Sequence, residues 1–257
     1  MCELFGVSSP EKLVLNDLLK ELFSHGKDHP HGWGMAFFYR GSVSLEKQPE
    51  PSHESKYLKQ RLRSKIEAAE MMAHIRYATK GTMDYENTHP FVLRDLSDRA
   101  WTLIHNGTIF DCNALNKYVF RQDGSTDSER ILLYLIDKIN EAMRKKGSEL
   151  SSAERFEIVD AVIHVIAPEN KVNLLLYDGE LLYAHTNLKD TLHVCQKGDA
   201  SILSTVPLDQ DEWKDVPLNT LVAYEKGQCR FVGKKHPYEF FEDEEKYRWL
   251  YLDYASL

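Results

Sequence analysis

Two helical segments near the middle of the chain separate an early group of short strand-like segments from a late one, and this order limits the possible folds. The early strands are expected at 2–8, 33–40, 71–76 and 99–105, where aromatic and β-branched residues gather. The late strands are expected at 171–177, 180–186, 191–196, 201–206, 219–225 and 228–232. This order is typical of an α+β protein, in which helices cover stacked antiparallel sheets.

Both central helices carry their own start and stop signals. Apolar residues recur at helical spacing over 126–146, where Thr126 begins a capping box and Gly147 offers a stop. A second capping box begins at Ser151, and that helix is expected to run until Pro168 ends it. Local sequence therefore predicts two long helices.

Weaker signals mark other elements. Helical patterns cover 10–25 and 54–70, although neither carries a clear cap. The dipeptides Asp178-Gly179 and Lys226-Gly227 each join two strand-like segments and favour tight hairpins. The late strands are therefore expected to be antiparallel.

Composition limits the partners and the compartment. The chain has 257 residues, with 40 acidic and 32 basic side chains and a formal charge of −8, which opposes binding to nucleic acid or to anionic lipid. No apolar run approaches the roughly 20 residues that cross a bilayer. We found no repeat and no linker rich in Pro, Gly or Ser. We therefore expect a single domain over 1–257, without a nucleic-acid or membrane partner.

The cysteine and histidine spacings do not suggest a disulfide framework or a metal site. Four cysteines lie far apart without a paired motif, which suits a reducing cytoplasm. His25, His29 and His31 lie among Gly, Pro and Asp without the spacing that places two imidazoles on one helical face. No metal and no cofactor are expected.

Cys2 directly follows the initiator Met1, so removal of one residue would place a thiol and a free α-amine on the same residue. An α-amine has a pKa of about 7.7–8, which allows it to accept the proton of a thiol whose pKa is about 8.5. Cys2 is therefore a candidate nucleophile with its own base. The alternative is a small apolar side chain buried at the start of a strand.

Several polar motifs follow in a fixed order along the chain. They are Met1-Cys2-Glu3-Leu4-Phe5-Gly6, His31-Gly32-Trp33-Gly34, His74 to Gly81, Asn87 to Phe91, His105-Asn106-Gly107 and Gly124 to Glu129. This ordered set resembles the class II glutamine amidotransferases of the N-terminal-nucleophile hydrolase superfamily, and within them the stand-alone YafJ-like branch. The resemblance implies a four-layer αββα sandwich of two antiparallel sheets. It also implies that Cys2 attacks the side-chain amide of glutamine and releases ammonia through a γ-glutamyl thioester.

The resemblance assigns two charged residues to the amino-acid end of glutamine. Arg76 would hold the α-carboxylate, because its planar guanidinium suits two parallel hydrogen bonds. Asp127 would hold the α-ammonium group. From the residues alone, Arg76 could instead form a surface ion pair, and Asp127 could belong to the acidic first turn of a helix.

The remaining assignments concern the reacting carbonyl and the pocket wall. Asn106 and Gly107 come directly after an expected strand and would form an oxyanion hole, although Asn-Gly is also a common hairpin turn. Tyr77 and Thr79 would line the glutamine pocket. Histidines 74 and 89 are expected to be structural, because the proposed mechanism already has a base.

Three other functions remain open. The chain could hydrolyse γ-glutamyl amides in peptides or modified amino acids, or it could be a catalytically silent glutamine-binding regulator. A metal-dependent hydrolase using His29, His31, His74 and His89 is a further alternative. An ammonia-accepting partner protein is also possible, because no acceptor domain is recognisable in the chain. The acidic and aromatic segment 239–251 could contact such a partner.

Overall fold

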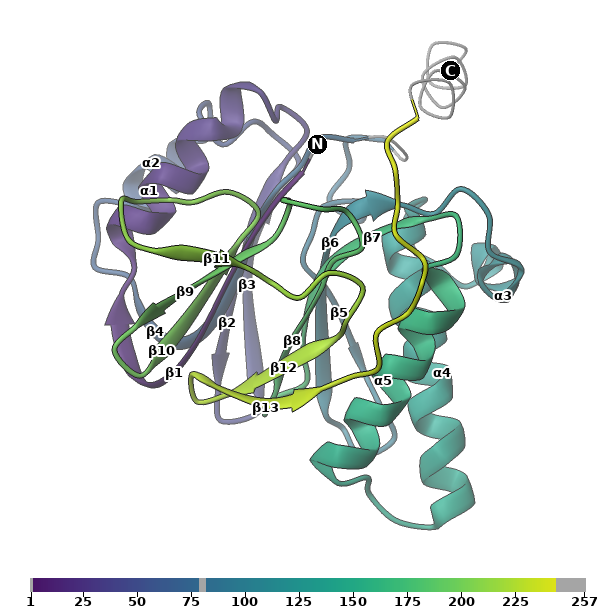
Figure 1. Cartoon of the computed structure of the whole chain (residues 1–257). Coiled ribbons are helices and arrows are strands. Elements are labelled where there is room, and N and C mark those ends of the chain that lie inside the picture. The colour runs from purple at the N-terminus through teal and green to yellow at the C-terminus, as the bar shows by residue number, and fades with distance from the viewer. Residues whose placement is uncertain (1, 79–81, 244–257) are drawn as a thin grey trace.

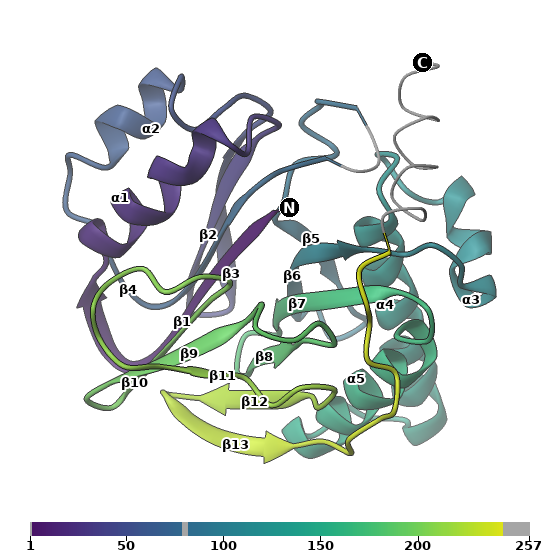
Figure 2. The same cartoon turned by 45° about the horizontal axis from the view of Figure 1, so that its top comes forward.

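Two antiparallel sheets lie face to face, and helices cover their outer faces (Figure 1). The structure is a computed structural model that describes residues 2–78 and 82–243. Helices, sheet, sheet and helices form four successive layers, as the turned view also shows (Figure 2). The predicted αββα arrangement of an α+β protein is therefore confirmed.

The first sheet combines the beginning of the chain with a much later segment. Its strands follow the order β11-β9-β10-β1-β4-β2-β3, so β1 lies in the middle. The bounds are β1 Glu3–Val14, β2 Trp33–Tyr39, β3 Ser42–Gln48, β4 Glu67–Ile75, β9 His193–Lys197, β10 Ala200–Ser204 and β11 Trp213–Asp215. Helices α1 (Asn16–Ser24) and α2 (Lys56–Arg61) cover its outer face.

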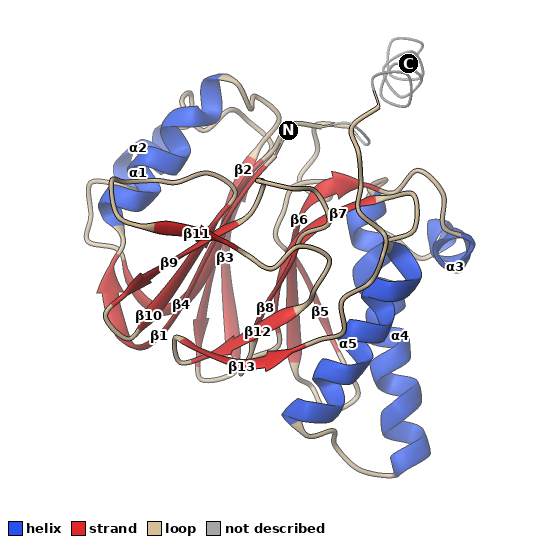
Figure 3. Cartoon of the chain, viewed as in Figure 1, coloured by secondary structure: helices blue, strands red, loops and turns tan. Residues whose placement is uncertain are grey.

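The second sheet has the order β13-β12-β8-β7-β6-β5. Its bounds are β5 Phe91–Arg94, β6 Ala100–Thr108, β7 Lys171–Tyr177, β8 Leu182–His185, β12 Val222–Glu225 and β13 Gln228–Val232. The long helices α4 (Asp127–Lys146) and α5 (Ser152–Ile166) cover it (Figure 3). Shorter helical pieces are α3 (Asn113–Asn116), η1 (His25–Lys27) and η2 (Lys117–Phe120).

Three apolar cores bind these layers together, and the middle one lies between the sheets. Leu4, Met72, Ile104 and Leu175 are members of that middle core. Side chains alternate between the two faces of a strand, so every second residue along β1, β4, β6 and β7 faces the space between the sheets. This alternation decides which side chains can meet at the end of the sandwich.

The two central helices have the predicted boundaries. Thr126 accepts a hydrogen bond from the backbone N–H of Glu129 and caps α4, whereas Ser151 and Glu154 complete a reciprocal box at α5. The Glu129 carboxylate instead accepts from the N–H groups of Asp123 and Gly124, at 2.7 and 2.9 Å. Only half of the first predicted box therefore forms, and its glutamate fixes the preceding loop.

Each weak helical pattern contains a helix, α1 or α2, but the predicted bounds were too wide. Residues 10–14 belong to β1, and most of 54–70 lies outside α2, with 67–70 in β4. The end of β1 pairs with the start of β4 beyond a bulge, as Leu13 with Ala68 and Val14 with Glu67. Pairing between distant segments thus overrides local helix propensity. Strands β3, β5 and β11 were not predicted.

Both predicted hairpins form, with a shift in one turn. β12 and β13 pair antiparallel across Lys226 and Gly227, which both have positive φ. β7 and β8 also pair antiparallel, but the N–H of Asp178 bonds to the carbonyl of Leu181 at 3.3 Å. The turn is therefore centred one residue later than predicted.

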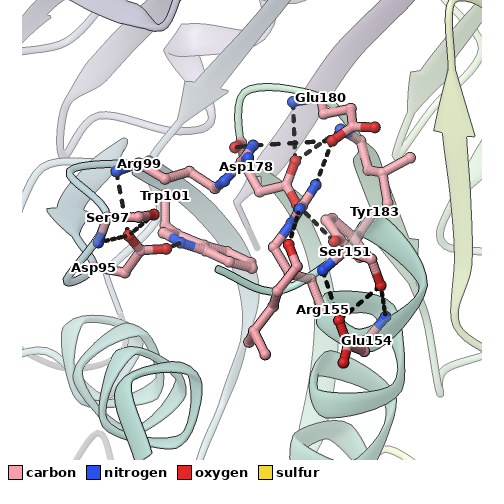
Figure 4. Close-up of polar contacts among 12 residues, drawn as sticks. Asp95, Ser97, Arg99, Trp101, Ser151, Glu154, Arg155, Asp178, Glu180 and Tyr183 are labelled. Carbon is pink, nitrogen blue, oxygen red and sulfur yellow. Dashed lines mark hydrogen bonds and ion pairs between the residues drawn. The ribbon is translucent and has the colours of Figure 1, made fainter. Parts of the chain in front are cut away.

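A buried ion pair fastens α5 to this β7–β8 hairpin (Figure 4). Arg155 Nε donates to Asp178 Oδ2 at 2.7 Å, and the side chains are 3% and 0% exposed. The hydroxyl of Tyr183 donates to the same carboxylate oxygen at 2.8 Å, and Arg155 Nη2 donates to Glu180 at 2.5 Å. Both charges are thus desolvated, and further hydrogen bonds satisfy them.

Candidate active site

The start of β1 and the end of β4 meet the end of β6 and the start of β7 at one edge of the sandwich. In Figure 1 the N-terminal mark lies at the same end of the molecule as the arrowhead of β6. Glu3 pairs with Ile75, so Cys2 lies level with the residues that follow β4. His74 Nε2 lies 3.4 Å from the carbonyl of His105 and links the two sheets here. The motifs that are distant in sequence therefore gather at this edge.

The backbone of Tyr77 holds the Cys2 thiol on two sides. The N–H of Tyr77 donates to Sγ, and the S–H lies within reach of the Tyr77 carbonyl, each at 3.3 Å. Burial raises the pKa of the Cys2 thiol, whereas the Tyr77 contact and the charges of Arg76 and Lys171 oppose that rise. Cys2 is thus held in place, and burial favours its thiol form while the neighbouring donor and charges favour its thiolate.

Arg76 is buried rather than exposed, which excludes the surface ion pair as its role. Its N–H donates to the carbonyl of Gly32 at 2.8 Å, and the N–H of His31 donates to its carbonyl at 3.1 Å. Its guanidinium Nη1 donates to the carbonyl of Thr82 at 3.0 Å. The backbone of Arg76 is therefore held against the segment before β2, and its side chain reaches the loop after β4.

Asn106 and Gly107 lie within β6 and not in a turn or after the strand. They pair with Asn173 and Val172 of β7, so the hairpin-turn interpretation is wrong. Asn106 is two residues from Ile104 and shares its face, toward the space between the sheets. Among the described residues, its carboxamide has no hydrogen-bond partner in the protein. A donor thus faces the same space as Cys2, which is two residues from Leu4.

Gly107 is required by close approach of the neighbouring strand. A Cβ atom at this position would lie 2.0 Å from the carbonyl oxygen of Lys171 and 2.3 Å from His105 Nε2. No side chain fits there without moving the backbone of β7. The glycine therefore allows β6 and β7 to pair closely beside Asn106.

Asp127 is the first residue of α4 and is buried. Its Oδ2 accepts a hydrogen bond from the N–H of Ile109 at 2.7 Å, which joins the end of β6 to the helix. The next residue, Ser128, has its hydroxyl 3.0 Å from His105 Nδ1. Asp127 therefore belongs to the acidic first turn and also reaches the strand that carries Asn106.

The pocket-wall predictions have different outcomes. The Tyr77 ring packs edge-on against His31 at 5.2 Å between centroids, and the N–H of Ala78 donates to His31 Nδ1 at 2.9 Å. Thr79 lies outside the described residues, as does most of the acidic and aromatic tail. Tyr77 therefore contributes its backbone to Cys2 and its ring to the neighbouring loop.

His74 and His89 pack against each other behind the site, with ring centroids 4.2 Å apart and the ring planes tilted by 50°. Burial lowers the pKa of His74 to about 3 and the pKa of His89 well below its usual range. Both imidazoles are therefore neutral near pH 7. No group of three or more metal-ligating side chains was found in the part of the chain that the structure describes.

One charged residue near the site, Lys171, was missed by the sequence reasoning, and its partner Glu242 was expected only as a possible contact to another protein. Lys171 begins β7 and is only 1% exposed, and its Nζ lies 3.4 Å from Glu242 Oε1. A lysine at a strand end is usually solvated, so the sequence did not indicate that Lys171 is buried. Its burial depends on pairing with β6 and on a segment about seventy residues later in the chain.

Sequence comparisons agree with the geometry. A family model described as glutamine amidotransferases class-II matches residues 1–199. "Putative glutamine amidotransferase YafJ" of Escherichia coli is 31% identical over 216 residues, which cover 82% of each chain. An uncharacterised protein of Methanocaldococcus jannaschii is 29% identical and covers 91% of this chain and 72% of its own length.

Solved structures share the fold. Glutamine phosphoribosylpyrophosphate amidotransferase from Bacillus subtilis superposes with a TM-score of 0.67 at 16% identity, over 92% of this chain and half of that enzyme. A "predicted glutamine amidotransferase" from Pseudomonas aeruginosa gives a TM-score of 0.61 at 20% identity, over 89% of this chain and 99% of its own. With the family match over residues 1–199, the chain therefore belongs to the class II glutamine amidotransferases.

Proposed function

We propose that this chain hydrolyses the side-chain amide of glutamine, with Cys2 as nucleophile and its own α-amine as base after Met1 is removed. The amine takes the thiol proton while Sγ attacks the amide carbon. Collapse of the tetrahedral intermediate returns a proton to the amide nitrogen, and ammonia leaves. Water then hydrolyses the γ-glutamyl thioester and frees glutamate.

The observation that carries this proposal is the pairing of a held thiol with an available amide donor across the gap between the sheets. Tyr77 fixes Cys2 Sγ with contacts of 3.3 Å, and the Asn106 carboxamide faces the same space. We assign Asn106, with the N–H of Gly107, to the developing oxyanion. Donors that are already oriented cost no reorganisation when the charge forms.

Arg76 and Asp127 would recognise the amino-acid end of the substrate. Both are buried at the edge where Cys2 lies, and they carry opposite charges that match an α-carboxylate and an α-ammonium group. Any γ-glutamyl amide with a free α-amino acid end presents the same groups. We therefore propose γ-glutamyl peptides as the alternative substrates. We also propose that Tyr77 and Thr79 line the pocket for the γ-glutamyl group.

We also propose that the protein works in the cytoplasm and that ammonia leaves the site. The cysteines of the described chain are all free thiols, which suits a reducing cytoplasm. None of the described helices is long and apolar enough to cross a bilayer. Ammonia would be released to water or passed to a partner protein.

Replacement of the nucleophile tests the scheme. Cys2→Ser should abolish ammonia release from glutamine, whereas Cys229→Ser, at an exposed cysteine on β13, should retain it. Intact mass should show that Met1 is absent from the active protein. Unchanged ammonia release from the Cys2→Ser protein would exclude the thioester. Turnover of γ-glutamyl peptides but not of glutamine would select the alternative substrates.

A further inference from the structure

Lys171 is a buried cation at the edge of the sandwich where Cys2 lies. It pairs with Thr108, one residue beyond Gly107, and its carbonyl lies 3.3 Å from His105 Nε2. Its side chain is 1% exposed, and burial lowers the pKa of its ammonium group. A buried ammonium is costly unless other groups use or compensate its charge.

Strand alternation directs this ammonium toward the nucleophile. Lys171 shares the face of Leu175, and Cys2 shares the face of Leu4, and both apolar residues belong to the core between the sheets. The two side chains therefore enter the same space from opposite sheets. In agreement, the charge of Lys171 lowers the pKa of the Cys2 thiol, and a Cys2 thiolate raises the pKa of Lys171.

The carboxylate that pairs with Lys171 comes from the end of the described chain. Residues 233–243, here called the C-terminal strap, follow β13 and run along the second sheet toward the site edge, in yellow in Figures 1 and 2. The N–H of Phe240 donates to the carbonyl of Asn187 at 2.7 Å, and its ring stacks on Phe110 at 5.8 Å. Phe240 thus anchors the strap, and Glu242 lies two residues beyond it.

The ion pair that results is asymmetric. Lys171 is almost wholly buried, whereas the Glu242 side chain is 49% exposed, and the charged atoms are 3.4 Å apart. Water therefore screens the carboxylate better than the ammonium. The field of Lys171 still reaches Cys2, because it lowers the pKa of the Cys2 thiol.

We propose that Lys171 is a positioning residue for the nucleophile, and that Glu242 on the C-terminal strap limits how much of its charge reaches Cys2. The assignment rests on Cys2 being the nucleophile. A cation facing the site favours the thiolate over the thiol, and it also favours the neutral form of the α-amine, which is the base. The strap and the first residue of the chain would thus act on the same reacting sulfur.

The other charged groups around the thiol are fixed and do not replace this pair. Arg76 approaches from β4 and also favours the thiolate. On the α4 side, the charge of Asp127 raises the pKa of His105 and the charge of Lys171 lowers it. Of these groups, only Glu242 is on the strap, so a change in the strap would act on Cys2 through Lys171.

The rate of alkylation of Cys2 by iodoacetamide as a function of pH tests the proposal. Lys171→Met keeps the length and removes the charge, so we expect the apparent thiol pKa to rise by about one unit and alkylation at pH 7 to slow roughly tenfold. Glu242→Gln should lower the same pKa and speed alkylation at pH 7 about two- to threefold. A merely structural ion pair would not give shifts of opposite sign.

Lys47→Met is the matched control. Lys47 is also largely desolvated, with a pKa lowered to about 8, and it donates to the carbonyl of Thr88 at 2.7 Å. It does not act on the thiol, so its removal should leave the alkylation profile unchanged. Superimposable profiles for wild type, Lys171→Met and Glu242→Gln would overturn the proposal. So would shifts of the same sign in the two variants.

Because Glu242 is half exposed, its variant should fold even if Lys171→Met does not, so the test remains decisive. Alkylation requires no glutamine. Opposite shifts in a protein that does not hydrolyse glutamine would support the role of Lys171 and contradict the proposed function. Normal ammonia release with unshifted alkylation profiles would support the proposed function and contradict the role of Lys171.

Discussion

At the residue scale, the site depends on a side-chain hydrogen-bond donor that is not used within the described part of the protein. Asn106 is buried in the middle of a ladder, yet its carboxamide has no partner among the described residues. Its polar atoms are not among the fully buried atoms that lack a hydrogen bond, so they remain accessible from the site edge. Such a donor is available for a charge that appears during the reaction.

Asn106→Ala should therefore lower kcat for glutamine hydrolysis by about 10²–10³, since one oxyanion donor is worth about 2.7–4 kcal/mol. KM should change little, because the donor acts on the transition state rather than on bound glutamine. Steady-state kinetics with a thermal melt to verify folding would measure both. A raised KM at constant kcat would assign Asn106 to substrate binding instead.

Residue types identified Cys2, Asn106 and Gly107 as candidates, but the sequence did not show how they are held. The requirement for glycine at 107 arises from the carbonyl of Lys171, on a strand more than sixty residues later. The burial of Lys171 depends on a register and on a strap that no local pattern encodes. Close approach between distant backbones was therefore the part that sequence reasoning missed.

At the element scale, local sequence predicted the helices that carry capping residues at their own ends. α4 and α5 carry their own caps, and both formed with the predicted boundaries. β1 and β4 have no such signals, and their extra length comes from pairing with each other across a bulge. One sequence does not show such long-range pairing, which explains why the helices predicted over 10–25 and 54–70 were too long.

The ion pair between α5 and the β7–β8 hairpin should contribute strongly to stability, because both partners are desolvated. Asp178→Asn removes the buried counter-ion of Arg155 and leaves only the partly exposed carboxylate of Glu180, so we expect the free energy of unfolding to fall by about 3 kcal/mol. Urea denaturation would measure the loss. Glu141→Gln, in an exposed pair with Lys138, should change it by less than about 1 kcal/mol. Equal effects in both variants would contradict this explanation.

At the scale of the whole molecule, the two sheets share one core, and the chain passes between them repeatedly. The first sheet takes β1 to β4 and β9 to β11, and the second sheet takes β5 to β8 and β12 to β13, so the two sheets alternate along the chain. We therefore propose that residues 1–257 act as one domain. Unfolding should then occur in one transition that is the same by fluorescence and by circular dichroism.

Stability should fall in mild acid because several imidazoles are buried in the neutral form. Burial lowers the pKa of His74 and His185 to about 3, and the pKa of His89 is also far below the usual 6.5 or so. The unfolded chain takes up these protons below about pH 6.5, and the folded chain does not. Each histidine thus removes about 1.4 kcal/mol per pH unit as the pH falls toward these lowered values.

Glu70 acts in the opposite direction. Burial raises its pKa to about 8, so the folded chain already holds this proton and gains stability as the pH falls from 8 toward 4.5. Glu70 offsets the effect of one of the three histidines, so the free energy of unfolding still falls between pH 6 and 5. Urea titrations at pH 7, 6 and 5 would measure it. His185→Gln should reduce the dependence by about one proton, and a free energy of unfolding that rises with acidity would refute this reasoning.

The central place of β1 has a consequence for biosynthesis. Its partner β10 is made about two hundred residues later, which corresponds to roughly 10–40 s of translation. Until then, the first residues on the nascent chain lack one neighbouring strand and the site edge is incomplete. An aminopeptidase working at the ribosome would therefore have access to Met1 before the sandwich closes, and the terminus that carries Cys2 would mature before it is enclosed.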